Sequence, residues 1–320
     1  MVKKLLAISL LIFIGARVFA QGDGPRSYLL APESVWGVVP KWLNLNQNLL
    51  PAGNILVDGA DIKIDVFPTT FFHTLGIKGR FAQILIMANP GTATGSLENS
   101  PPALPRTELN ASGFSDGFVA FKMGLINAPA LNIKEFASQP HSFSLNGYFR
   151  LWYSGTYDSN KLLNLGSNRL TFELGAPMAI PFGKNPKRAT WLEVYPNIQF
   201  FTDNNDPARS STSQKIEQQP LFLLENHLTH NFTTKFWAGL DLRYHFGGQT
   251  IADGIKDDNR INMLGGGVSA GYQLLPFLAA NASYGQILLG ENNAQSEMIR
   301  LTLTFSYVNM KKIQTPNEND

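Results

Sequence analysis

The chain has 320 residues, with 26 basic and 24 acidic side chains, 44% hydrophobic residues and no cysteine. The lack of cysteine excludes a disulfide framework and a thiolate metal site, and the balanced charge gives no basic patch of the kind that nucleic acid binding requires. Mean hydropathy is −0.08, and no apolar run of about 18 residues follows the first twenty, which excludes a helical membrane-spanning protein.

Residues 1–20 have the pattern of a signal peptide for export. They begin with a positive charge, continue with an apolar stretch and end on Val18-Phe19-Ala20, a small-residue cleavage site. The mature chain is therefore expected to begin at Gln21, without a lipid anchor because no cysteine follows the cleavage site. Residues 21–33 are expected to form an N-terminal periplasmic segment.

The rest of the chain alternates apolar and polar residues with a period of two. In residues 299–307 the odd-numbered side chains are apolar and the even-numbered ones polar, so one face of a strand suits hydrocarbon and the other suits water. This alternation predicts an all-β fold, a transmembrane antiparallel β-barrel of about 12 strands over residues 34–308. The predicted strands are 34–48, 61–73, 80–89, 113–127, 141–153, 168–182, 190–202, 219–231, 235–247, 260–273, 277–289 and 297–308.

The connections between these strands alternate in length. Those after even-numbered strands are mostly tight, whereas those after odd-numbered strands are mostly longer and polar, as in 154–167 and 203–218. Short periplasmic turns and long external loops are typical of outer-membrane barrels, with both termini in the periplasm. One longer turn, 128–140, is predicted to hold a short helix at 132–138, and residues 309–320 form a polar C-terminal tail.

The strand pattern also assigns residues to the lumen. In residues 236–246, Asp241, Arg243 and His245 share a face opposite to a row of large apolar residues. Arg or Lys at the lipid midplane would cost about 2–4 kcal/mol, so the strand face that carries the charged residues should point inward. The predicted lumen-lining residues are Lys63, Asp65, Lys122, Arg150, Arg169, Glu173, Glu193, Glu225, Asp241, Arg243 and Arg300. In a narrow barrel these opposite charges should pair with one another.

Prolines and aromatic residues refine the strand assignment. Pro68, Pro177 and Pro196 lie within predicted strands, where a closed barrel cannot hide a missing N–H, so they should mark bulges or strand ends. Candidates for interfacial aromatic girdles are Trp36, Trp42, Trp191, Tyr195, Tyr244, Tyr272 and Tyr307.

No catalytic pattern stands out. The five histidines are scattered, and His227 and His230 fall on opposite faces of a strand, so they are better interpreted as girdle or loop residues. No metalloprotease, nucleophile-elbow or phosphate-loop motif occurs. Residues 203–206 and 253–258 lack the ligand spacing of a calcium loop. The run Gly265-Gly266-Gly267 fits strand curvature better than phosphate binding. No cofactor or metal is implied.

The chain resembles the meta-pathway phenol degradation family of outer-membrane β-barrels, whose members are described as transporters. The resemblance covers nearly all of the mature chain. It rests on Gly113-Phe114-Ser115-Asp116, on the stretches 124–131, 160–169 and 200–206, and on Gly247-Gly248-Gln249-Thr250 with Asp253-Gly254. Where the family commonly has proline after the residue that matches Asp116, this chain has Gly117, which implies a looser turn. The resemblance implies phenolic or other apolar small molecules as the solute class, and it supplies no binding residues.

We therefore interpret the chain as an outer-membrane barrel that passes or binds small solutes and has no chemistry of its own. The alternatives are a sealed structural or assembly barrel and a barrel enzyme that modifies membrane lipid. The expected partners are outer-membrane lipid, an unidentified small solute and the barrel-assembly machinery, which recognises the aromatic end of the final strand in proteins that this chain resembles.

Overall fold

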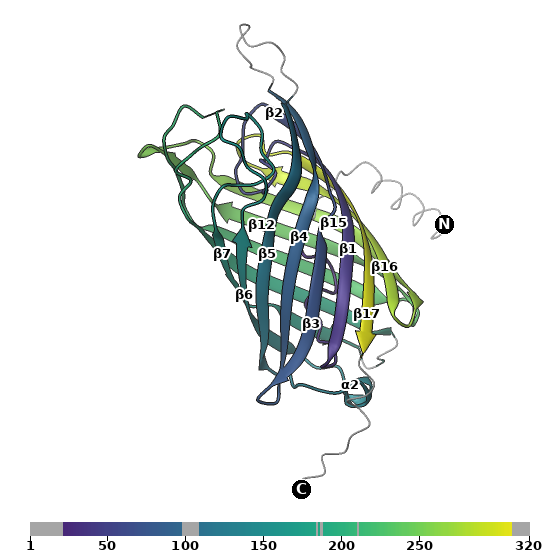
Figure 1. The fold of residues 1–320 in the computed structure, drawn as a ribbon. Helices are drawn as coiled ribbons and strands as arrows, with labels where there is room; N and C mark the ends of the chain where they lie inside the picture. Colours follow the sequence, from purple (N-terminus) through teal and green to yellow (C-terminus); the bar gives the residue numbers. More distant parts are fainter. Residues whose placement is uncertain (1–21, 98–108, 184, 186–187, 210, 309–320) are drawn as a thin grey trace, which may run out of the picture.

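In the computed structural model, residues 22–97, 109–183, 185, 188–209 and 211–308 are described. Over these residues the chain forms one closed antiparallel β-barrel with twelve strand positions (Figure 1). The last strand, β17 (Ser296–Val308), pairs with β1 (Val35–Gln47) along its length and closes the wall. Closure pairs the backbone without leaving a strand edge in the membrane. The expected signal peptide (1–20) and C-terminal tail (309–320) lie outside the described residues.

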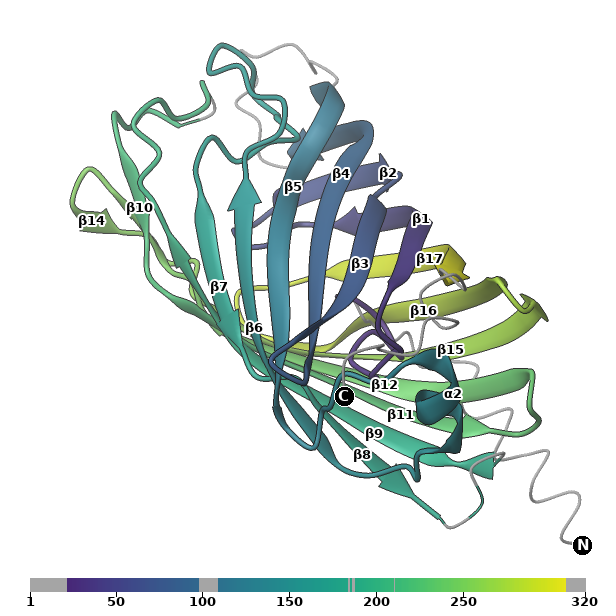
Figure 2. The same ribbon diagram turned by 60° about the horizontal axis from the view of Figure 1, so that its bottom comes forward.

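The wall follows the order of the chain. From β1 it continues through β2 (Ala60–Val66) and β3 (Thr69–Ile77), β4 (Arg80–Leu97), β5 (Leu109–Ile126), β6 (Ser144–Tyr153), β7 (Thr171–Gly175) and β8 (Met178–Phe182), β9 (Thr190–Phe201), β11 (Leu221–Asn231), β12 (Phe236–Gly247), β15 (Ile261–Leu275), β16 (Leu278–Gly290) and β17. A small separate sheet joins β10 (Ile216–Gln218), β13 (Thr250–Ala252) and β14 (Ile255–Lys256) among the long loops (Figure 2). The predicted number and order of barrel strands are confirmed.

Two of the twelve positions are interrupted at prolines. Pro68 separates β2 from β3, and Pro177 separates β7 from β8, as expected for strand ends. Pro196 lies inside β9, and its carbonyl accepts a hydrogen bond from the N–H of Ala176 at 3.0 Å. Because both backbone groups of a residue in an antiparallel ladder point to the same neighbour, the missing N–H of Pro196 faces the gap between β7 and β8.

The short helix α2 (Ile133–Ser138) lies at the end of the barrel opposite the long loops (Figure 1). Asn132 caps it: its side chain accepts from the N–H groups of Lys134 and Glu135, and the Glu135 carboxylate accepts from the N–H of Asn132. This capping box satisfies backbone donors that a six-residue helix leaves unpaired. The helix predicted at 132–138 is confirmed.

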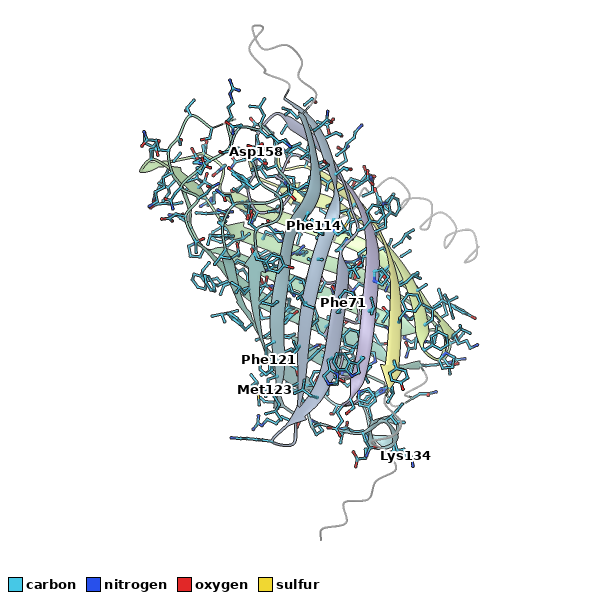
Figure 3. All side chains as sticks on the ribbon, in the orientation of Figure 1. Phe71, Phe114, Phe121, Met123, Lys134 and Asp158 are labelled. Atoms are coloured by element: carbon cyan, nitrogen blue, oxygen red, sulfur yellow. The ribbon has the colours of Figure 1, made fainter. Side chains whose placement is uncertain are left out.

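The middle of the wall has apolar residues outside. Phe71 (β3), Phe121 (β5) and Leu240 (β12) are among its exposed large side chains. In Figure 3, Phe71, Phe121 and Met123 lie on the wall, between Asp158 among the long loops and Lys134 in α2. We call this part of the barrel the membrane wall.

The ends of β1, β2, β4 and β5 next to the long loops have the opposite arrangement, and we call them the outer rim. β4 and β5 extend to 97 and from 109, through residues predicted to be loop, and pair there with β2 and with each other. Their inward side chains form an apolar core with Met298 of β17 and two leucines from the loop at 154–170. The core consists of Leu43, Leu45, Ile62, Ile64, Val66, Ala93, Ala111, Leu163, Leu165 and Met298.

The outward face of the outer rim is polar. Asn46 pairs with Lys63 across the strands, Lys63 with Thr94, and Thr94 with Asn110. Asp116 fastens the loop inside the rim, because its carboxylate accepts the N–H groups of Gly155 at 3.0 Å and Ser167 at 2.9 Å. Asp116 therefore lies in β5 and holds this loop, rather than forming the looser turn that its following glycine suggested.

Candidate functional site in the barrel lumen

Nine of the eleven predicted lumen residues lie inside the barrel. All but Arg243 are buried, and Arg243 lines an interior cavity. The nine residues are Lys122, Arg150, Arg169, Glu173, Glu193, Glu225, Asp241, Arg243 and Arg300. Arg169 lies at the outer end and not on a strand, and it donates to the side chain of Asn54 at 3.1 Å. Burial lowers the pKa of this arginine to about 10.

The prediction for the other two residues, Lys63 and Asp65, is wrong. Their side chains point outward from the outer rim, and Asp65 accepts a hydrogen bond from outward-facing Asn44 at 2.9 Å. The alternate residues of β2, among them Ile62 and Ile64, occupy the interior. The rule that charges point inward assumes hydrocarbon outside, whereas the outer face of the rim around Lys63 and Asp65 is polar and suits water.

The N-terminal segment, residues 22–33, enters the lumen instead of remaining in the periplasm as expected. Its backbone N–H groups meet two lumen carboxylates. Gly24 donates to Glu225 at 3.0 Å, while Arg26 and Tyr28 donate to Glu193 at 2.5 and 2.8 Å. Carboxylates with donors of this kind are satisfied despite burial. The lumen acids therefore pair with this segment as well as with lumen bases.

Lumen cations engage the carbonyl groups of the same segment. Arg300 donates to the carbonyl of Gly22 at 2.8 Å, and Lys41 donates to that of Asp23 at 3.1 Å. Lys41 was not among the predicted lumen residues, because β1 alternates weakly around Pro40. Charges on both sides of the barrel thus bind the backbone of one short segment.

An ion pair adds side-chain specificity to this contact. Asp23 lies 2.5 Å from Arg150, whose other guanidinium nitrogen is 3.6 Å from Glu173. The guanidinium also lies over the rings of Phe118 and Trp152, 4.5 and 5.0 Å from their centroids. Buried charges are tolerated where they are paired in this way, and removal of one partner is costly.

Two glycines allow the segment to approach the charges closely. A Cβ at Gly22 would overlap the Glu225 carboxylate, and a Cβ at Gly24 would overlap the Arg300 guanidinium. Gly24 also has a φ of +94°, a conformation that favours glycine. The Gly22-Asp23-Gly24 sequence thus fits the space between these side chains.

Two histidines interpreted as girdle or loop residues are buried in the lumen. His227 Nε2 lies 2.7 Å from Glu225, and its Nδ1 is hydrogen-bonded to Asp241. His245 is 4% exposed, and neither of its ring nitrogens has a hydrogen-bond partner among the described residues. The strand pattern had already placed His245 on the inward face with Asp241 and Arg243, and its burial agrees with that placement. For His227, the parity that it shares with Glu225 was the signal that could have placed it in the lumen.

Tyr195 also differs from its prediction as a girdle residue. It is 2% exposed, and its hydroxyl donates to Glu173 at 2.6 Å. Its ring packs 4.6 Å from that of Tyr28 in the N-terminal segment. Tyr195 lies near the middle of β9 and on the same face as the charged Glu193, and this position places it inside the barrel.

The N-terminal segment separates two cavities. The outer cavity, of about 160 Å³, lies between Gly22 and Asp23 on one side and the loop at 51–54 on the other. The inner cavity, of about 470 Å³, lies on the opposite side of the segment and includes Trp237 and Tyr272. Asp23 borders both cavities, so residues of the segment form the partition between them.

The carboxylates of the outer loops make hydrogen bonds and ion pairs with neighbouring loop residues. The Asp253 carboxylate accepts from the N–H groups of Gln214 and Lys215, and the Lys215 ammonium lies 2.8 Å from Asp203. Hydrogen bonds to Asp203 and Glu217 raise the pKa of Lys215. Within the described part of the chain, no three or more metal-ligating side chains form a group that could hold a metal ion. No helix in that part is long and apolar enough to span a membrane.

The glycine run lies in β15, where it makes room for charged neighbours. Gly265 is opposite Arg243 and Gly267 is opposite Asp241, and the pairing with β16 shifts between Leu264 and Gly265. Bulges and glycines of this kind bend barrel strands. This geometry agrees with the prediction of curvature and room for lumen contents.

A closed twelve-stranded barrel with an apolar outer wall and a charged lumen defines the protein as a β-barrel of the bacterial outer-membrane type. The model of the family described as "Putative MetA-pathway of phenol degradation" matches residues 60–303, and the chain belongs to this family.

Solved structures agree with this fold. An outer membrane channel from Pseudomonas putida F1 has a TM-score of 0.71 and 18% sequence identity, over 90% of this chain and 100% of that chain. The translocator domain of the autotransporter NalP from Neisseria meningitidis has a TM-score of 0.50 and 10% identity, over 85% of this chain and 89% of that chain. A comparison with curated proteins gives no match. At these identities the likeness supports the barrel fold.

Proposed function

We propose that the protein passes small solutes, aromatic or apolar in character, across the outer membrane through its lumen. The observation that carries the proposal is the arrangement of two cavities along the lumen, with the N-terminal segment between them. Hydrogen bonds and an ion pair hold the segment to the barrel wall. A solute can replace these contacts one at a time, or thermal motion can break them one at a time. Movement of one short segment would join the cavities.

Family membership and the channel among the similar structures support this proposal. The protein acts by binding and passage, without catalysis or a cofactor. A cleaved signal peptide delivers it, its apolar wall contacts outer-membrane lipid, and the assembly machinery recognises the final strand through Phe305 and Tyr307. N-terminal sequencing of the mature protein tests the cleavage after Ala20.

Uptake of labelled small solutes into liposomes that contain the protein tests passage. Deletion of residues 22–28 should increase uptake because it removes the partition, and a chain lacking the predicted tail at 309–320 is the control. A difference in gel migration between boiled and unboiled samples verifies folding, since closed barrels resist detergent until heated. No uptake by the folded full chain or by the folded deletion variant would contradict the proposal.

A sealed structural barrel is the second candidate. The apolar core of the outer rim and the N-terminal segment both fill the interior, and this filling favours a barrel that stays closed. In that case neither the full chain nor the deletion variant transports any solute of the panel, although both fold.

A further inference from the structure

The inner cavity gathers positive charge. Five of the side chains that line it are cations: Arg26, Lys41, Lys122, Lys235 and Arg300. Asp23 is the one carboxylate of the described residues that lines this cavity, and it is already paired with Arg150 at 2.5 Å. The inner cavity therefore differs from the outer one, where carboxylates outnumber cations.

These cations lack counter-charges. None of the five forms an ion pair with a carboxylate inside the described ranges. Lys41 donates to the carbonyl of Asp23 at 3.1 Å, and Lys122 donates to the carbonyl of Ser27 at 3.3 Å. An ammonium group has three donors, so each lysine can make further hydrogen bonds. A carbonyl dipole compensates only part of a buried charge, which leaves a free-energy cost that an anion would remove.

The acidic residues of the wall are engaged outside this cavity. Glu193 accepts the N–H groups of Arg26 and Tyr28. Glu225 accepts the N–H of Gly24. Neither carboxylate lines the inner cavity, so the positive charge at its surface is not cancelled there.

Ser27 brings the two lysines to one place. Its hydroxyl donates to the carbonyl of Asp23 at 3.1 Å, the same oxygen that accepts from Lys41. Its own carbonyl accepts from Lys122. The two ammonium groups therefore approach the same short stretch of the N-terminal segment from opposite parts of the wall, β1 and β5. A ligand beside Ser27 meets both.

Neutral donors next to each lysine lack partners. Thr70, Gln83 and Thr302 are 7%, 9% and 6% exposed, and their side chains make no hydrogen bond to any described residue. Their polar atoms remain accessible from the cavity that they line. Gln83 pairs with Lys122 across β4 and β5, and Thr302 pairs with Lys41 across β17 and β1. Each lysine thus has a neighbouring amide or hydroxyl that can donate to the same anion.

The rest of the lining suits a small organic molecule. The volume of about 470 Å³ lies within the range of about 300–1,000 Å³ that is typical of ligand pockets. Phe72, Leu85 and Trp237 are half-buried and contribute apolar surface. A ligand with an apolar body and one negative group matches this combination.

We propose that the inner cavity binds a small organic carboxylate with an apolar body, whose carboxylate is held by Lys41 and Lys122. Gln83 and Thr302 donate further hydrogen bonds to it, and the apolar body lies against the aromatic side chains. The site goes beyond the proposed function, because that function concerns solutes of aromatic or apolar character and assigns no anion to the lumen. Binding depends on negative charge first and on the apolar body second.

Equilibrium dialysis of the folded full chain in nonionic detergent against labelled hexanoate tests the site. The measurement is made near neutral pH, where a carboxylic acid is ionised, and a chamber with detergent alone corrects for partition. Saturable binding is expected, and added salt should weaken it because ions screen the lysines. Hexanol and hexylammonium should compete at least about tenfold less well than unlabelled hexanoate, since neither offers a carboxylate to the lysines. Equal competition by hexanol would overturn the assignment of an anion.

Variants connect the binding to the named side chains. Lys41→Met and Lys122→Met keep side-chain length but remove the charge, and each should weaken hexanoate binding about tenfold. Lys122→Arg keeps the charge and should bind within about threefold of the native protein. Lys63→Met removes the same charge from the outer face of the rim and is the matched control. Gel migration before and after boiling shows whether each variant is folded.

A further variant separates anion binding from an effect on the N-terminal segment. Gln83→Met leaves both lysine contacts with the segment in place and should weaken binding about threefold, as for the loss of one hydrogen bond. If the folded Lys41→Met and Lys122→Met variants bind hexanoate normally, the site is refuted. It is also refuted if Lys122→Arg binds as poorly as Lys122→Met while Gln83→Met binds normally, because the lysine then acts only on the segment.

The site and the proposed function fail separately. If the protein transports neutral solutes into liposomes but shows no saturable binding of hexanoate, the site is refuted and passage stands. If it binds hexanoate with the expected competition but transports no neutral solute, the site stands and passage of such solutes is refuted.

Discussion

The outer rim continues four strands of the membrane wall but has the opposite polarity. In the wall, Leu240 faces outward and Asp241 inward, whereas in the rim Lys63 faces outward and Ile64 inward. Both regions obey the same physical rule, because each side chain matches what lies on its own side. The wall has hydrocarbon outside and charges inside, while the rim has a polar exterior and loop leucines inside.

The comparison teaches that strand alternation carries two separate pieces of information. It shows that the two faces of a strand meet different surroundings, and this inference is correct for both β2 and β12. It does not show which face is inside, since that depends on whether lipid or water surrounds the barrel at that height. Substitutions in the two regions can test this difference directly.

The largest expected effect is a charge inside the rim. Ile64→Asp should lower the free energy of unfolding by about 3–5 kcal/mol, because Ile64 is 1% exposed in an apolar core and offers the carboxylate no partner. Lys63→Ala, one residue away on the outward face, should change it by no more than about 0.5 kcal/mol. Denaturant titration of the protein in lipid vesicles measures both values. Equal losses in the two variants would mean that the rim is not inverted.

A charge on the outside of the wall is the converse test. Leu240→Arg should cost about 2–4 kcal/mol, since this exposed side chain faces lipid near the middle of β12. Thr94→Arg, on the polar outer face of the rim, should cost no more than about 0.5 kcal/mol. The same titration measures both. A costly arginine at position 94 would place hydrocarbon around the rim.

A smaller effect on stability is expected in the lumen, together with a change in conductance. Arg150→Ala leaves Asp23 and Glu173 without their cation and should cost about 1–3 kcal/mol. It should also raise the single-channel conductance severalfold and shift selectivity toward cations, because a cation that lines the passage and anchors the segment is lost. Arg243→Ala should shift selectivity in the same direction.

Currents through planar bilayers measure both effects, and Lys63→Ala, whose side chain lies outside the barrel, is the control. Unchanged currents in both arginine variants would show that Arg150 and Arg243 do not line the passage.

The smallest effect is expected at α2, at the end of the barrel opposite the long loops. This helix belongs neither to the membrane wall nor to the outer rim. Asn132→Ala removes the cap of α2 and should destabilise this helix by about 1 kcal/mol without changing global unfolding, because α2 has no buried residues. Hydrogen exchange at the amides of Lys134 and Glu135 should accelerate about fivefold. Lys134→Ala keeps the cap and is the control. A matching change in global unfolding would show that α2 supports the barrel.

The sequence by itself determined the twelve strand positions, their order, the capped helix and the inward face of the membrane wall. These features depend on local period and on charges that lipid excludes, so Glu225 or Asp241 could be placed from neighbours two residues away. The breaks at Pro68 and Pro177 were also local, since proline lacks a donor.

Tertiary structure decided the rest. Residues 22–33 carry no periodic pattern, and their position in the lumen depends on Glu193, Glu225 and Arg300, which lie far along the chain. The outward position of Lys63 depends on leucines that a distant loop brings into the rim. Such contacts leave no local signal, because the free energy that fixes them comes from groups that meet only after the barrel has closed.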